Sequence, residues 1–257
     1  MNGAMDDARI ERERYRERAR RALAAPSEAE PALGSAAVPP IFRAPYAAYE
    51  QVLREVLRPG QSVLEIGAGA GLHTAALASN GASVVATDVA FESLLLLGRN
   101  LGARGACVRA VAADMEALPF RDGAFDVVAS AGSLSYGDPT RVDAETARVL
   151  RRGGAFVCVD SLDHNPIYRA NRWLAYRRGE RTASTLRRMP DRRRIEAIGR
   201  RFEAVDVRYF GGFTWMMPLV ARVVGEAAAA RLSDFLDRVA GVRLSAFKFV
   251  LVARGLR

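Results

Sequence analysis

The chain has 257 residues, half of them hydrophobic, a composition that suits one α/β domain with a cap or tail and excludes wholesale disorder. Its formal net charge is +9, almost entirely from arginine, which indicates either affinity for an anionic partner or simply an arginine-rich composition. With no apolar leader, no spanning stretch of roughly 18 apolar residues and no metal-ligand spacing at Cys107 and Cys158, we expect a cytoplasmic protein with free thiols and no bound metal.

The first 40 residues are predicted to form a charged tail and a linker. Residues 1–22 mix Arg and Glu with little apolar face, and four prolines follow within residues 24–40. The folded domain is expected to span residues 41–257. It begins with a helix, because apolar residues recur at helical spacing from Tyr46 to Leu57, just before Pro59-Gly60.

Strands alternate with helices between residues 61 and 161. This alternation implies parallel strands joined by right-handed crossovers, with helices on both faces of the sheet. Ligands of such sheets bind at the carboxyl ends of the strands. The predicted strands are 62–66, 83–88, 106–114, 125–132 and 153–161, and the predicted helices are 71–80, 90–101 and 139–151.

Beyond residue 161 the pattern changes to a cap region, 162–240, with a strand inside it and another after it. An Arg-rich segment at 163–201 and an apolar segment at 213–240 are predicted to be helical, and strands are predicted at 202–212 and 244–255. These two strands complete a Rossmann-like, doubly wound, mostly parallel sheet of seven strands, with a helical insertion between the fifth and sixth. The apolar part of the cap is read as a lid, a membrane-contacting surface or ordinary core.

A glycine-rich turn follows the first strand. Glycines at 67, 69 and 71 let the backbone bend sharply and approach a ligand without interference from a Cβ atom. The helix behind the turn directs its free N–H groups at whatever binds there. Asp88 ends the next strand, 21 residues after Gly67, where an acidic residue holds ribose hydroxyls in dinucleotide folds.

Two details distinguish this turn from an NAD-binding turn. The spacing is GxGxG rather than GxGxxG, and Glu65 lies two residues before the first glycine. A carboxylate there repels a pyrophosphate but suits the cationic amino-acid end of S-adenosylmethionine. An NAD-dependent oxidoreductase therefore stays an alternative, and both the glycine spacing and Glu65 weigh against it.

The segment VLEIGAGAG at 63–71 resembles motif I of the class I S-adenosylmethionine-dependent methyltransferases. ATD at 86–88, AADMEALPF at 112–120, FDVVASAGSLSY at 125–136 and RVLRRGGAFVCVD at 148–160 are similar to the motifs that follow it, so the resemblance covers residues 45–162. It implies an enzyme of the small-molecule type with S-adenosyl-L-methionine as cofactor. The cofactor-binding residues that it implies are Glu65, Gly67, Ala68, Gly69 and Gly71 at the methionine end, Asp88 and Val89 at the ribose, Asp114 and Met115 at the adenine, and Ser130 near the sulfonium.

Methyl transfer from a sulfonium depends mainly on positioning and on excluding water, and it needs a general base only when the acceptor must lose a proton early. His164, which follows the fifth strand, is the predicted catalytic residue because the ordinary pKa of histidine is near neutrality. A structural histidine in the turn DHNP is the competing interpretation. Tyr136 is a further candidate in the loop after the fourth strand.

Several features bear on the acceptor. Residues 130–133 lack the Asn/Asp-Pro-Pro-aromatic run of enzymes that methylate DNA amines, and no Pro-Cys nucleophile is present, so we expect no DNA substrate. The segment 169–201 is rich in arginine, with Tyr168, Trp173 and Tyr176 interleaved. It suits the phosphates of an anionic small molecule, or RNA, or forms a solvated helix face.

Residues 163–190 resemble bacterial methyltransferases of polysaccharide or small-metabolite pathways. We therefore predict methylation of an O or N atom of a small molecule, with a saccharide or a lipid-linked intermediate as the candidate class of acceptor. Peripheral contact with a membrane stays open. An RNA methyltransferase and a non-catalytic protein that binds the cofactor are the remaining alternatives.

Overall fold

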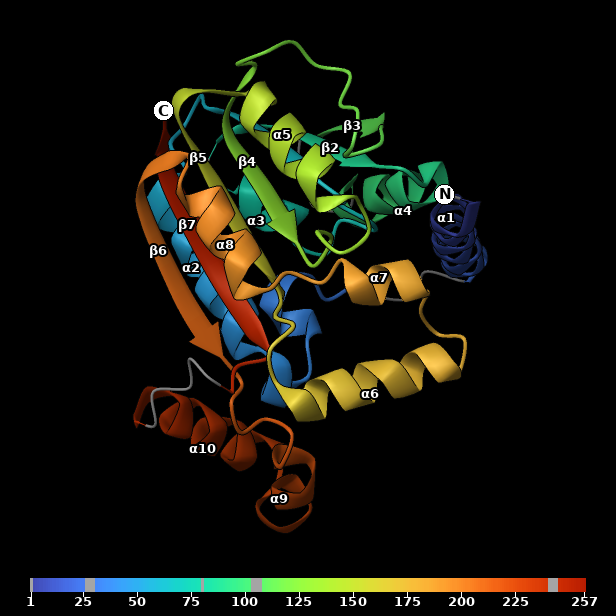
Figure 1. The fold of residues 1–257 in the computed structure, drawn as a ribbon, viewed down its shortest axis with the longest axis vertical. Coiled ribbons are helices and arrows are strands. Elements are labelled where there is room, and N and C mark those ends of the chain that lie inside the picture. Colours follow the sequence, from blue (N-terminus) through green and yellow to red (C-terminus); the bar gives the residue numbers. More distant parts are fainter. Residues whose placement is uncertain (1, 26–30, 80, 103–107, 240–244) are drawn as a thin grey trace.

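Seven strands form a single sheet in the computed structural model, which describes residues 2–25, 31–79, 81–102, 108–239 and 245–257 (Figure 1). The strands are β1 (Ser62–Ile66), β2 (Ser83–Asp88), β3 (Val108–Ala112), β4 (Phe125–Ala131), β5 (Leu150–Ser161), β6 (Phe202–Phe210) and β7 (Lys248–Leu256). Their order across the sheet is β3-β2-β1-β4-β5-β7-β6. Strands β1 to β5 are parallel, β7 is antiparallel to β5, and β6 is antiparallel to β7. The predicted seven-stranded, mostly parallel fold is confirmed.

Helices cover both faces of this sheet, and two hydrophobic cores result. Alternate residues of β1 face opposite cores: Leu64 and Ile66 belong to the core that includes residues of α5 and α8, whereas Val63 belongs to the core that includes residues of α2 and α3. This two-sided burial explains why the strands read as continuous apolar runs. The helices are α1 (Asn2–Ala24), η1 (Gly34–Ala37), η2 (Pro40–Phe42), α2 (Ala44–Val56), α3 (Thr74–Ala78), α4 (Phe91–Gly102), α5 (Pro139–Val149), α6 (Pro166–Arg177), α7 (Ala183–Arg187), α8 (Arg192–Gly199), α9 (Met217–Val224) and α10 (Glu226–Val239).

The cap segments are more broken than their composition indicated. The helical stretch predicted at 163–201 is three helices, because Gly179 has a positive φ of 73° and Asn165, Thr182 and Asp191 each accept backbone N–H bonds at a new helix start. The stretch predicted at 213–240 divides at Gly225, which has a φ of 81°. Cys107 and the first residues of the strands predicted at 106–114 and 244–255 lie outside the described residues.

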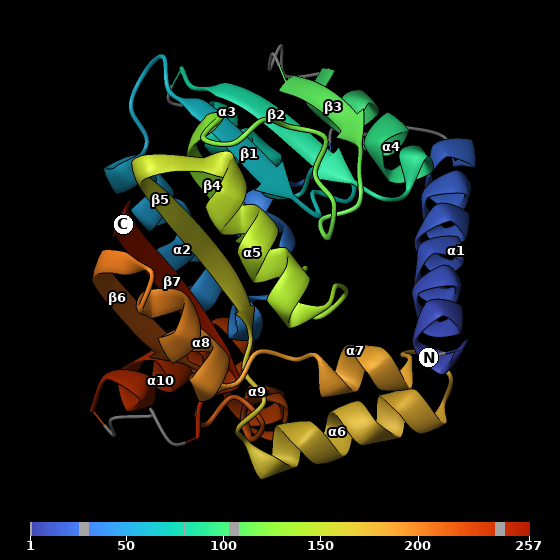
Figure 2. The same cartoon turned by 45° about the horizontal axis from the view of Figure 1, so that its top comes forward.

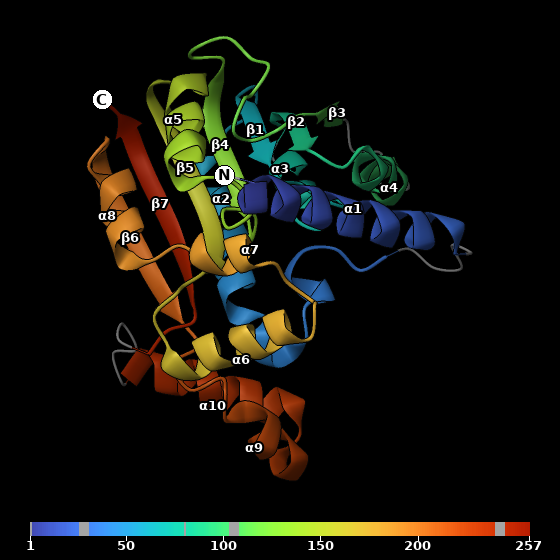
Figure 3. The ribbon, with the colours of Figure 1, turned by 45° about the vertical axis from the view of Figure 1, so that its right-hand side comes forward.

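The charged N-terminal run forms one long helix, α1, that lies against α4 at one end and α7 at the other (Figures 2 and 3). Near α4, Arg16 and Arg20 donate to the carboxylate of Glu92 at 3.0 and 2.7 Å. Near α7, the buried Glu11 accepts hydrogen bonds from Thr182 and Thr185 at 3.0 to 3.1 Å. The charges of α1 thus attach it to the rest of the molecule, and the domain boundary at residue 40 stays a prediction.

Within the part of the chain that the structure describes, no helix has both the length and the apolar character that crossing a membrane would need.

Candidate functional site

The turn between β1 and α3 depends on three glycines with positive φ angles of 66°, 55° and 80°, at Gly67, Gly69 and Gly71. A Cβ atom at Gly67 would lie 2.3 Å from the Cβ of Ser133, and one at Gly71 would lie 2.8 Å from the Cγ of Leu97. A Cβ at Gly69 would meet nothing within 4 Å. Two of the glycines therefore allow close packing, and the middle one leaves the backbone open to a ligand.

Glu65 points from β1 toward the start of α3. It is 2% exposed, and its Oε2 accepts a hydrogen bond of 2.6 Å from the hydroxyl of Thr74. Burial raises the pKa of Glu65 to about 7, against the hydrogen bond from Thr74, and the charge of Asp88 adds to the rise. A carboxyl group near the middle of its titration at neutral pH gains charge readily when a cation binds beside it.

Asp88 ends β2 on the other side of the turn. Its two carboxylate oxygens accept backbone hydrogen bonds from Gly69, at 2.9 Å, and from Ala90, at 2.8 Å. Burial raises the pKa of Asp88, and the backbone hydrogen bonds oppose that rise. These bonds fix the carboxylate against the turn, and each oxygen keeps a further lone pair for a hydroxyl donor. Of the two neighbouring predicted residues, Ala68 is buried and Val89 is exposed.

Ser130, at the end of β4, is joined to the turn through a serine that the sequence did not single out. The hydroxyls of Ser130 and Ser133 lie 2.7 Å apart, and that of Ser133 donates to the carbonyl of Ile66 at 3.0 Å. Both serines are buried. The pair fixes the loop after β4, residues 132–138, against Ile66, the last residue of β1. We call this loop the β4 exit loop.

The residues predicted for the adenine differ in their surroundings. Met115 lies beside the turn, because a Cβ added at Gly67 would be 3.5 Å from its Cε and one added at Gly137 would be 3.2 Å from its Sδ. Asp114 is exposed, and one of its carboxylate oxygens accepts a hydrogen bond of 2.9 Å from the backbone N–H of Glu116. Asp114 thus stabilises a local turn, and its carboxylate remains accessible to solvent or to a ligand.

The two histidines lie in unlike places. His164 is half-buried in the turn after β5, and its role as a base stays a prediction. His73 is 5% exposed, and its ring stacks on Tyr46 with the centroids 4.9 Å apart. Burial lowers the pKa of His73 to about 4, although the nearby carboxylate of Glu50 acts in the opposite direction. His73 is therefore neutral at physiological pH and forms part of an aromatic stack behind the turn.

Further polar side chains lie at, or shortly after, the carboxyl ends of β4 and β5. Asp160 is buried, and its oxygens accept backbone hydrogen bonds from Leu134 at 2.9 Å and Ser161 at 2.6 Å, so it holds the two loops together. Tyr136 follows β4. Its hydroxyl contacts the hydroxyl of Tyr15 on α1 and accepts a hydrogen bond from the guanidinium of Arg181. Sequence reasoning named Tyr136 but missed Tyr15, because nothing in a charged N-terminal run indicates where it docks.

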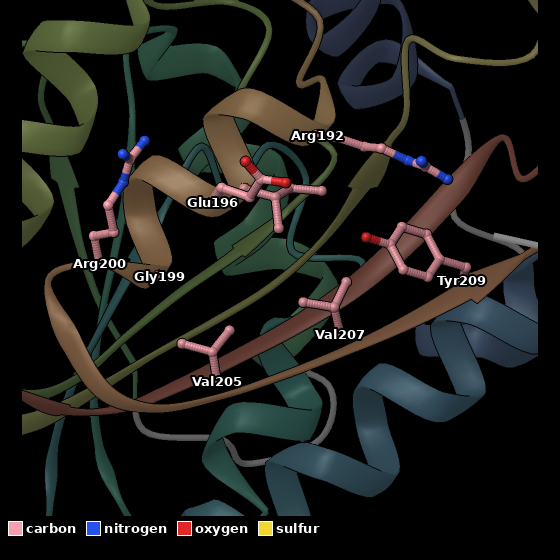
Figure 4. Close-up of a pocket in the computed structure, with 8 residues that line it drawn as sticks. Arg192, Glu196, Gly199, Arg200, Val205, Val207 and Tyr209 are labelled. Carbon is pink, nitrogen blue, oxygen red and sulfur yellow. The ribbon is translucent and has the colours of Figure 1, made fainter. Parts of the chain in front are cut away.

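A separate cavity of about 700 Å³ lies between α8 and β6, at the edge of the sheet (Figure 4). None of the predicted cofactor residues borders it. Its residues are Arg192, Ile195, Glu196, Gly199, Arg200, Val205, Val207 and Tyr209. The candidate site is therefore the glycine turn and the neighbouring strand ends, not this cavity.

Comparison with known proteins gives a family match over the part of the chain that contains the turn. Residues 64–158 match the family described as a methyltransferase domain. A demethylmenaquinone methyltransferase of Clavibacter sepedonicus is 40% identical over 112 residues, which is 43% of this chain and 45% of that protein. The "Ubiquinone/menaquinone biosynthesis C-methyltransferase UbiE" of Acidiphilium cryptum is 37% identical over 108 residues, 40% of this chain and 43% of that protein. The matched segment thus spans less than half the length of these relatives.

Solved structures resemble the fold over a larger share of the chain. Geranyl diphosphate C-methyltransferase from Streptomyces coelicolor, solved with S-adenosyl-L-homocysteine, superposes with a TM-score of 0.58 at 19% identity and covers 82% of this chain and 79% of its own. The [4+2]-cyclase SpnF superposes with a TM-score of 0.56 at 20% identity, covering 81% and 80% of the two chains. At such identities the likeness shows the fold alone.

Proposed function

We propose, from the premise that this chain contains a class I S-adenosylmethionine-dependent methyltransferase domain, that it transfers a methyl group from S-adenosyl-L-methionine to a small molecule. The observation that carries the proposal is the placement of Glu65 and Asp88 on either side of a glycine turn whose middle residue faces open space. The residues present fit a cationic nucleoside: a buried carboxyl for the ammonium group, and a fixed carboxylate for the ribose hydroxyls.

When bound, the cofactor supplies a methyl group on a positively charged sulfur that leaves as a neutral thioether. The protein's part is to hold the reactants in line and to exclude water. Glu65 binds the ammonium group, Asp88 orients the ribose, and Met115 packs beside the adenine. Ser130 and Ser133 keep the β4 exit loop, and with it Tyr136, next to the turn. The acceptor binds at the ends of β4 and β5, within reach of Tyr136 and His164.

Calorimetric titration with S-adenosylhomocysteine tests the cofactor site. We expect saturable binding to the wild-type chain and an affinity at least about tenfold lower for Asp88→Ala, since a pair of charge-assisted hydrogen bonds contributes more than about 1.4 kcal/mol. Asp206→Ala serves as the control, because Asp206 lies exposed on β6 and its side chain forms a surface ion pair with Arg208. Absence of binding to the wild type would refute the function, and an unchanged affinity for Asp88→Ala would refute the ribose assignment.

Carbon is a second candidate for the methylated atom, beside the predicted oxygen or nitrogen. Its support is the name of the UbiE relative, a C-methyltransferase of quinone biosynthesis. Incubation with S-adenosylmethionine labelled with ¹³C in the methyl group separates the candidates, because the chemical shift of the transferred methyl differs for carbon, nitrogen and oxygen. A panel of quinols, saccharides and lipid-linked saccharides provides the acceptors.

A further inference from the structure

Two half-buried arginines near the ends of β4 and β5 have no acidic partner among the residues that the structure describes. Arg172, on α6, donates to the hydroxyl of Ser161 at 2.8 Å and to that of Tyr168, and its guanidinium lies 4.7 Å above the ring of Tyr168. Arg181, between α6 and α7, donates to the hydroxyl of Tyr136 at 3.4 Å. By contrast, the buried Arg194 lies 2.8 Å from the carboxylate of Asp143.

These two arginines belong to one cluster with three tyrosines, and we call it the arginine–tyrosine cluster: Tyr15, Tyr136, Tyr168, Arg172 and Arg181. Tyr168 contacts Arg172 directly. Arg181 interacts electrostatically with all three tyrosines. The rings of Tyr15 and Tyr136 meet edge to face with centroids 5.4 Å apart. The cluster thus joins α1, the β4 exit loop, α6 and the start of the α7 segment.

The cluster borders the cofactor turn. The backbone N–H of Tyr136 donates to the carbonyl of Ser133 at 3.1 Å. The side chain of Ser133 in turn lies directly against Gly67, since a Cβ added at Gly67 would be 2.3 Å from the Cβ of Ser133. Ser161, the partner of Arg172, ends β5 at the same edge of the sheet. A group held by the cluster therefore lies beside whatever the glycine turn binds.

Lys248 adds a third positive charge at this edge. It pairs with Ser161 in the register of β5 and β7, is 8% exposed, and has its Nζ 4.8 Å from the centre of the Tyr46 ring. It too has no ion pair among the described residues. Burying cationic groups without acidic partners is costly, and three of them at one sheet edge create a field that attracts an anion.

We infer that the acceptor carries an oxyanion, a phosphate or a carboxylate, that Arg172 and Arg181 bind while the tyrosine hydroxyls donate to it. The planar fork of arginine matches the spacing of oxygens in both groups, and partial burial strengthens the attraction. This inference rests on the proposed function. It narrows the substrate to anionic small molecules and makes the two arginines specificity-determining residues.

Titration of the protein saturated with S-adenosylhomocysteine tests the inference, with inorganic phosphate in one series and acetate in another at an ionic strength held constant with sodium chloride. We expect at least one of the two anions to bind saturably. Arg172→Gln and Arg181→Gln should each weaken that binding about tenfold, the loss of one charge-assisted bidentate contact. Arg178→Gln is the matched control, because Arg178 is exposed at the end of the same helix, and its affinity should equal that of the wild type.

Calorimetry with S-adenosylhomocysteine on each variant separates this inference from the proposed function. If the cofactor product binds but neither anion does, or if both glutamine variants bind the anion as the wild type does, the inference is overturned while the function stands. If the cofactor product does not bind, the function itself fails. Arg172→Gln alone keeps the test decisive should Arg181→Gln not fold, because no residue of α6 is buried.

Discussion

The two sides of the site are built in opposite ways. On the proposed donor side, Glu65 and Asp88 are acidic and come from consecutive strands. On the proposed acceptor side, Arg172 and Arg181 are positive and come together with tyrosines at 15, 136 and 168. The contrast matches a cationic methyl donor facing an anionic acceptor. It also shows that a site made from neighbouring residues is visible as a motif, whereas one made by tertiary assembly is not.

The largest effect on stability and on cofactor affinity is expected from replacing Gly67, the glycine of the turn with the closest neighbour, by alanine. Gly67→Ala must adopt a positive φ, at about 1–2 kcal/mol, and displace Ser133, at about 1–3 kcal/mol more. We expect a loss of about 3 kcal/mol in the free energy of unfolding, measured in urea, and cofactor affinity lowered by about a hundredfold or more. Gly69→Ala, whose Cβ meets open space, should lose only about 1–2 kcal/mol of stability. Equal losses in the two variants would mean that contact with Ser133 does not matter.

Titration of Glu65 tests whether the donor side acts through its charge. With a pKa of about 7, Glu65 is mostly ionised at pH 8 and mostly protonated at pH 6, and only the ionised form attracts an ammonium group. The dissociation constant of S-adenosylhomocysteine should therefore rise about tenfold from pH 8 to pH 6, as measured by calorimetry. Glu65→Gln should bind weakly and without this pH dependence. A wild-type affinity that is constant over the range would show that Glu65 does not contact the ammonium group.

Loosening α1 should disturb the acceptor side and spare the donor side. Glu11→Ala leaves the buried hydroxyls of Thr182 and Thr185 without their acceptor, at a cost of about 1–3 kcal/mol in docking of α1. Hydrogen exchange should become faster in α1 and α7 but not in β1 or β2. Glu13→Ala is the control, since Glu13 is exposed and its ion pairs with Arg16 and Arg20 are 3.6 and 3.7 Å long. Equal exchange in the two variants would contradict the role given to Glu11.

The smallest effect concerns the neutral histidine behind the donor turn. The pKa of His73 is about 4 in the folded protein and 6.5 in its ordinary state, so the unfolded chain takes up a proton first as the pH falls. His73 therefore costs stability increasingly from pH 7 downward, by under about 1 kcal/mol between pH 7 and pH 6.

Glu65 has the opposite sign, because its raised pKa lets the folded chain bind the proton first between about pH 4.5 and 7. The difference in unfolding free energy between His73→Phe and the wild type isolates the histidine. It should grow in favour of the variant from pH 7 to pH 6, and a constant difference would remove His73 as the cause.

The sequence was most informative where contacts are local. The period of apolar residues predicted the alternating strands and helices, and that fold is confirmed. The motifs between residues 63 and 160 resemble those of class I methyltransferases, and residues 64–158 match the methyltransferase-domain family. The individual cofactor roles and the role of His164 stay predictions. Tyr15, Ser133 and the pairing of Arg172 with Ser161 had no detectable signal, because each depends on which distant segment folds against it. The breaks at Gly179 and Gly225 differ from the continuous helices that composition predicts, although glycine is a common helix end.

The position of α1 connects two parts of the molecule that are far apart in the sequence. One helix contacts Glu92, four residues after Asp88, near one end, and the segment that follows Arg181 near the other. A shift of that segment toward a bound anion must either move α1 with it or break the bonds to Glu11. Moving α1 would displace its contact with Glu92, whereas breaking the bonds to Glu11 would leave that contact in place. The first 24 residues therefore link the segment after Arg181 mechanically to the start of α4 only as long as Glu11 keeps its hydrogen bonds.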